Sequence, residues 1–142
     1  MLVLLVVLAG SVAVSVLVYR QMRTKTVRLD APPEMALSEG GALCGNAEFV
    51  LGPRSVGEWV LPLEKGQTAS GSVAVQGRDD ADIGLRIYSP NNRVVFYDGK
   101  RSPQPHFEVP ALIRGDYLFK FDNRHSVFSD KQVTVSVCLS RH

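Results

Sequence analysis

From residue 48 onward, apolar and polar side chains alternate in short runs that are separated by turn residues. In one run, Ile83, Leu85 and Ile87 occupy the same face of a strand. The runs cover residues 48–51, 57–63, 68–76, 82–89, 93–98, 106–109, 117–121 and 131–140. Each alternating strand has one apolar face, and two sheets of such strands bury these faces against each other. The pattern predicts an all-β, antiparallel β-sandwich of seven to eight strands over residues 48–142.

The last run also predicts the direction of a cysteine. Val133, Val135 and Val137 share the core face, so Cys138 should point away from the core, toward solvent or toward the segment that precedes the sandwich. Cys44 lies in that segment. A disulfide between the two would close a loop of roughly 95 residues and would stabilise the fold by about 4 to 5 kcal/mol. Two separate thiols are the alternative, and they are the expected state in the cytoplasm.

The N-terminal pattern is different, because residues 2–19 form an uncharged apolar run. A helix of this length spans about 27 Å, which is close to the thickness of a hydrocarbon core. A cleaved signal peptide is the competing interpretation. The run is long for a signal peptide, lacks a basic flank before it, and is not followed by an Ala-x-Ala site. The sequence therefore predicts a transmembrane anchor at residues 1–19.

A basic segment at residues 20–29 comes directly after the apolar run, with Arg20, Arg23, Lys25 and Arg28 as expected membrane-surface residues. The positive-inside rule and anionic lipid both favour a cytoplasmic side for the domain. Two cysteines in one small domain favour the opposite side, where a disulfide persists. The side of the single-pass membrane protein is therefore left open, with the charge bias leaning to the cytoplasm.

Residues 30–47, with paired prolines and paired glycines, are expected to be a linker. The chain has 142 residues, of which 45% are hydrophobic, so one folded domain with an appendage is expected. Four of the sixteen basic residues precede residue 29, which leaves twelve against fourteen acidic ones. A slightly acidic folded part argues against nucleic acid as a partner.

The stretch GDYLFKFDNRHSVFSDKQV at residues 115–133 resembles the signature of the GOLD (Golgi dynamics) domain, which includes the lumenal domain of eukaryotic transmembrane cargo receptors. The resemblance is strong over residues 113–137 and diffuse back to about residue 48. It implies a β-sandwich used for protein–protein contact rather than chemistry. The matching residues are Gly115, Tyr117, Phe119, Phe121, Asp122, Asn123, Ser126, Phe128, Ser129 and Lys131.

Two features depart from the cargo receptors. Lys120 stands where their aromatic strand has a cysteine, so their disulfide does not transfer. Their membrane helix lies after the domain and carries a tail with sorting signals, whereas the apolar run here precedes the domain. A divergent or prokaryotic anchored GOLD-like protein fits these departures better than a true cargo receptor.

Most signature residues also have a structural explanation. Gly115 suits a tight turn with positive φ, and Tyr117 suits a tyrosine corner, with a buried ring and a hydroxyl bonded to backbone. Asp122 and Asn123 suit Asx turns. Phe128 is expected to plug one end of the sandwich. The alternative is a ligand contact from the loop at residues 123–130, since loops at sandwich ends carry function.

A second resemblance lies at Asp80–Val95, which is similar to the strand-turn-strand of bacterial pre-peptidase C-terminal domains. The turn that begins at Gly115 suits that family too. The Asp-Asn-x-x-Ser-x-Phe continuation does not, and it favours GOLD.

Candidate chemistry is sparse. His106, His125 and His142 have no metal-ligand spacing, and no nucleophile elbow or phosphate loop is present. Asp79, Asp80 and Asp82, with Asp98, would suit weak calcium binding, although a solvated acidic turn is the simpler interpretation. No cofactor and no enzymatic activity are predicted.

We therefore expect a membrane-anchored protein–protein interaction module, of adaptor or trafficking-receptor type. Its partners would be an unidentified protein and the bilayer, through residues 2–19, while a small-molecule ligand is not expected. Small residues such as Ala9, Gly10 and Ser11 would allow oligomers through close helix pairing. The alternatives are an accessory structural subunit of a membrane complex and a calcium- or glycan-binding sandwich.

Overall fold

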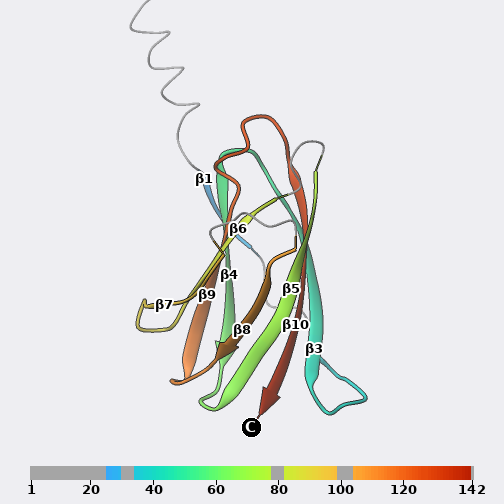
Figure 1. Ribbon diagram of the computed structural model, residues 1–142, viewed down its shortest axis with the longest axis vertical. Coiled ribbons are helices and arrows are strands. Elements are labelled where there is room, and N and C mark those ends of the chain that lie inside the picture. Colours follow the sequence, from blue (N-terminus) through green and yellow to red (C-terminus); the bar gives the residue numbers. More distant parts are fainter. Residues whose placement is uncertain (1–24, 30–33, 78–81, 99–103, 142) are drawn as a thin grey trace, which may run out of the picture.

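Ten strands build two five-stranded sheets in the computed structural model, which describes residues 25–29, 34–77, 82–98 and 104–141 (Figure 1). The first, here called the β9 sheet, has the order β1 (Lys25–Arg28), β4 (Ser55–Leu63), β9 (Gly115–Asp122), β6 (Gly84–Tyr88) and β7 (Val94–Asp98). The second, the β10 sheet, has the order β2 (Ala36–Leu37), β3 (Leu43–Leu51), β10 (Lys131–Arg141), β5 (Gln67–Gln76) and β8 (His106–Pro110). The predicted β-sandwich is confirmed.

The eight runs predicted as strands correspond to β3 to β10, and two further strands lie in segments without a clear period. β1, in the expected basic segment, pairs with β4 in parallel, whereas the other pairs are antiparallel. β2 lies in the expected linker, and β3 begins at Leu43, five residues before the expected start of the sandwich. β1 has four residues and β2 has two, which is too few for alternation to reveal either strand.

Within the described ranges, no helix is long and apolar enough to cross a bilayer. The predicted anchor at residues 1–19 lies outside those ranges, as do Arg20 and Arg23. Lys25 and Arg28 are exposed on β1.

The core is built around the aromatic face of β9. Tyr117, Phe119 and Phe121 are buried. The ring of Phe119 packs edge-on against Trp59 of its own sheet, with 5.0 Å between ring centroids, and against Phe107 of the β10 sheet, at 5.3 Å. Edge-to-face aromatic pairs add about 0.5–1.5 kcal/mol each to the burial of their surface. The buried aromatic face of β9 therefore holds the two sheets together.

A buried asparagine joins the two sheets at one end. Asn123, directly after β9, is fully buried, and its Nδ2 donates to the carbonyl of Gly52 (2.8 Å) and, at 3.3 Å, to that of Leu51 at the end of β3. Its backbone N–H donates to the carbonyl of Ser55 at the start of β4 (3.0 Å). One side chain thus binds two carbonyls where β3 turns into β4, and the Gly52 carbonyl also accepts the Ser55 hydroxyl.

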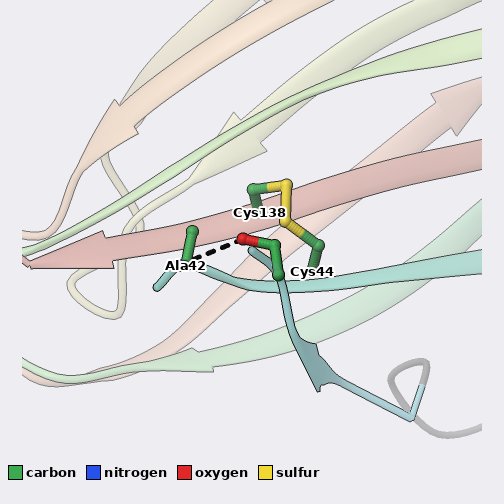
Figure 2. Close-up of a disulfide and its surroundings, with 4 residues drawn as sticks. Ala42, Cys44 and Cys138 are labelled. Carbon is green, nitrogen blue, oxygen red and sulfur yellow. Dashed lines mark hydrogen bonds between the residues drawn. A yellow bond between two sulfur atoms is a disulfide. The ribbon is translucent and has the colours of Figure 1, made fainter. Parts of the chain in front are cut away.

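The two cysteines form a disulfide, Cys44–Cys138, which joins β3 to β10 at directly opposed positions (Figure 2). On β10, Val133, Val135 and Val137 are buried, and Cys138 lies on the other face, as the alternation predicts. The bridge lies beside the turn that precedes β3, where the backbone N–H of Ala42 donates to the hydroxyl of Ser38 (3.2 Å). It closes a loop across a sequence separation of 94 residues.

Replacing both cysteines, Cys44→Ser with Cys138→Ser, should lower the free energy of unfolding by about 2–5 kcal/mol, because the unfolded chain loses its cross-link. Urea unfolding followed by tryptophan fluorescence measures the change. The native chain with dithiothreitol should show the same loss, once a thiol assay counts two free cysteines. An unchanged midpoint in both experiments would contradict the prediction.

Asn123→Ala should lower the free energy of unfolding by about 2–3 kcal/mol, because it removes the buried hydrogen bonds from Nδ2 to the carbonyls of Leu51 and Gly52. Asn46→Ala is the matched control, since Asn46 is exposed on β3, and it should stay within about 0.5 kcal/mol of the native protein. Thermal unfolding of both variants gives the comparison. Equal losses would show that the side chain of Asn123 does not join the sheets.

Candidate functional site

An open groove of about 770 Å³ lies on the outer face of the β9 sheet. Strand alternation aims the side chains of Leu85 and Phe119 into the core and leaves mainly the intervening positions to line the groove. Gly84 contributes no side chain there, and a Cβ at this position would lie 3.3 Å from the Cβ of Asp122. The lining residues are Thr26, Val56, Glu58, Gly84, Leu85, Arg86, Tyr88, Tyr97, Asp98, Lys120, Asp122, Arg124 and His125.

A row of paired positions runs across four strands on this face. Glu58 of β4 is opposite Lys120 of β9, which is opposite Arg86 of β6, which is opposite Tyr97 of β7. The Lys120 Nζ lies 3.0 Å from the Glu58 Oε1 and 5.4 Å from the centre of the Tyr88 ring. The row therefore presents a carboxylate, two cations and aromatic rings side by side.

Arg86 is held between two tyrosines. Its Nη1 donates to the Tyr88 hydroxyl (3.3 Å), and its guanidinium lies 4.5 Å from the centre of the Tyr97 ring. Hydrogen bonds to the hydroxyls of Tyr88 and Tyr97 raise the pKa of Arg86 above its ordinary value. A stacked guanidinium keeps its planar donors in one orientation, which favours recognition of a carboxylate. This cation is exposed and contacts both tyrosines.

Two further ion pairs lie where β9 ends. Asp122 binds Arg124 through both carboxylate oxygens, and its Oδ1 also accepts the backbone N–H of Arg124 (2.9 Å), which makes an Asx turn. Burial raises the pKa of Asp122, but the hydrogen bonds from Arg124 outweigh it, and the pKa is lowered. His125 Nε2 lies 2.8 Å from Asp82 Oδ1. These contacts hold the end of the groove in one arrangement.

β7, at the margin of the groove, is an edge strand of the β9 sheet among the described strands. β7 pairs with β6 on one side, and no described strand pairs with its other side. Its side chains are mostly apolar: Val94 and Val95 are exposed, and Tyr97 is 62% exposed. An apolar, unpaired edge strand can accept a strand from another chain.

The groove lining combines charged side chains with tyrosine rings. Among the described residues, no group of three or more His, Cys, Asp or Glu side chains could hold a metal ion. Asp82, considered for calcium, is paired with His125, while Asp79 and Asp80 lie outside the described ranges. Arg86 beside Tyr88 and the exposed Tyr97 matches protein-contact surfaces, where arginine and tyrosine are enriched.

The structure places most of the signature residues in the closing hairpin, away from the outer face. Gly115 has φ 146°, and a Cβ there would lie 2.7 Å from Pro90 Cγ, so only glycine fits. The buried Tyr117 donates its hydroxyl to the carbonyl of Ile113 (3.1 Å), the geometry of a tyrosine corner. Lys131, whose side chain is buried, begins β10.

Phe128 does not plug the sandwich, which corrects the expectation from the sequence: it is 93% exposed. The Ser126 hydroxyl donates to the carbonyl of Ser129 (3.0 Å), and the Ser126 N–H donates to that of Asn123 (3.2 Å). These bonds close the loop tightly, and Val127 and Phe128 form its tip. Asn123, rather than an aromatic ring, fills this end of the sandwich.

Sequence reasoning did not identify the groove residues as a site. The alternation at 82–89 does place Arg86 and Tyr88 on the outer face. Nothing local, however, indicates that β9 lies between β4 and β6, and only this order aligns Glu58 and Lys120 with Arg86.

Two solved structures of low identity are similar to this chain. A periplasmic inhibitor of g-type lysozyme, PliG, from Aeromonas hydrophila is 17% identical, with a TM-score of 0.51, and the match covers 83% of this chain and 98% of that one. The pre-peptidase C-terminal domain of a Bacillus anthracis collagenase is 10% identical, with a TM-score of 0.45, over 81% and 94% of the two chains.

No curated protein matches the sequence. A model of the emp24/gp25L/p24 family/GOLD matches residues 60–142, which is more than half of the chain and includes β9, the closing loop and β10. The chain therefore belongs to the emp24/gp25L/p24 family/GOLD.

Proposed function

We propose that this protein is a membrane-tethered GOLD module that binds another protein through the groove and the neighbouring edge of β7. The family supports a non-catalytic interaction module. The observation that carries the proposal is the row from Glu58 to Tyr97, with two cations, a carboxylate and an exposed aromatic ring, which ends on a strand whose outer edge pairs with no described strand.

The arrangement favours an extended acidic segment as the bound element. A strand added to β7 would satisfy its outward backbone groups, and the side chains of that strand would alternate toward the groove and away from it. A carboxylate on the groove side could bind Arg86, whose planar donors are already oriented by Tyr88 and Tyr97. Lys120, paired with Glu58, supplies a second cation that such a ligand would share.

We further propose that residues 2–19 tether the domain to a bilayer and that the domain lies on the oxidising, extracytoplasmic side. The Cys44–Cys138 disulfide supports that side, because cytoplasmic thiols are kept reduced. It argues against the cytoplasmic lean of the basic residues. The family likewise suggests a membrane-associated protein of the secretory pathway.

A photo-crosslinking residue at position 97 tests the binding surface in the full chain, in its native membrane. Tyr97→p-benzoylphenylalanine should give one adduct of discrete mass, because Tyr97 borders both the groove and the strand edge. Val50→p-benzoylphenylalanine is the control and should not give this adduct, because Val50 is 65% exposed on β3 in the other sheet.

Arg86→Glu in the chain that carries the crosslinker should reduce the yield at position 97 by about tenfold or more, since a repulsive charge costs at least about 1.4 kcal/mol of binding. Arg114→Glu is the matched control, because Arg114 is exposed beside Glu64 at the other end of the sandwich. Adducts that are insensitive to Arg86→Glu, or equal at positions 97 and 50, would contradict the proposal.

A further inference from the structure

An exposed apolar tip lies at one end of the sandwich, and its residues do not belong to the row from Glu58 to Tyr97. Phe128 is 93% exposed, and Val127 beside it is exposed as well. The N–H of Arg54 donates to the carbonyl of Ser126 (2.9 Å), so the turn between β3 and β4, with the exposed Pro53, lies against the same loop. Pro53, Val127 and Phe128 are here called the apolar tip.

The first described residue lies at the same end. Lys25 pairs with Ser55 at the start of β4, and its N–H donates to the carbonyl of Arg54 (3.3 Å). Arg54 thus contacts both Lys25 and the loop that carries the tip. Figure 1 shows β1 and the loop between β9 and β10 at one end of the sandwich, and the end of β10 at the other.

The length of chain before Lys25 limits where a bilayer can lie. Only residues 20–24 separate the apolar run from Lys25. A chain of that length spans at most about 20 Å when fully extended. If residues 2–19 are embedded in the bilayer, its surface must therefore lie close to the end of the sandwich that carries the apolar tip.

The charges at this end are compatible with a lipid headgroup layer. Lys25 is exposed and Arg54 is partly exposed, while Asp122 is paired with Arg124, and Asp130 is the acidic group in the loop itself. Cations next to an exposed aromatic side chain are the combination that interfacial segments present to lipid.

We propose that the apolar tip inserts into the membrane surface, with Phe128 among the headgroups, as a second contact beside the N-terminal tether. This inference depends on the tether in the proposed function. Two contact points would hold the long axis of the sandwich at a fixed inclination to the bilayer. The outer face of the β9 sheet would then be presented to partners at a defined height above the membrane.

Phe128→Trp tests the insertion with the full chain in vesicles of phosphatidylcholine and phosphatidylglycerol. The native Trp59 is buried and provides the background signal. Lipids brominated on the acyl chain should quench the added tryptophan severalfold more than they quench the native protein, and aqueous acrylamide should quench it little.

Leu112→Trp is the matched control, because Leu112 is 75% exposed and comes after β8 at the opposite end. It should show the reverse pattern, with strong quenching by acrylamide and little by brominated lipid. The inference would be overturned if acrylamide quenched Phe128→Trp as strongly as it quenches Leu112→Trp. Protection from both quenchers would also overturn it, since protein rather than lipid would then cover the tip.

An alkaline carbonate wash of the vesicles separates the two proposals. A chain that the wash removes has no tether, and both the tether and the insertion are then refuted. If the chain stays in the vesicles but acrylamide quenches Phe128→Trp strongly, the tether is retained and only the insertion is refuted.

Discussion

The structure depends on the burial of one aromatic face of β9 between the two sheets. Phe119 contacts Trp59 in its own sheet and Phe107 in the other, and Phe121 packs against Phe49 of β3, with 5.1 Å between ring centroids. These contacts come from a single strand near the centre of its sheet, so that strand sets the distance between the layers. Its outer face is consequently free to carry polar side chains.

The same strand connects the core to the candidate binding surface. Lys120 lies between Phe119 and Phe121 in sequence and points the opposite way, into the groove. Its ammonium is partly exposed and pairs with Glu58 on the neighbouring β4. The alternation of β9 thus separates the apolar contacts that stabilise the fold from the charged contacts available to a partner.

The two ends of the sandwich differ in a way that affects orientation. One end holds Asn123, the apolar tip and the start of β1, while the other holds the end of β10 and the turn after β8. The disulfide joins β3 and β10 outside the tip loop, and hydrogen bonds of Ser126 close that loop. The membrane contact proposed for the tip and the protein contact proposed for the groove therefore involve different residues.

The sequence by itself determined the β-sandwich, the eight longer strands, the inward face of β9 and β10, and the outward direction of Cys138, because alternation is a local property of a strand. It also determined the corner at Tyr117. Only the tertiary structure decided that Cys44 lies opposite Cys138, that Glu58, Lys120, Arg86 and Tyr97 form one row, and that Phe128 faces outward. Strand order and loop closure arise from contacts between residues distant in sequence, which no local pattern records.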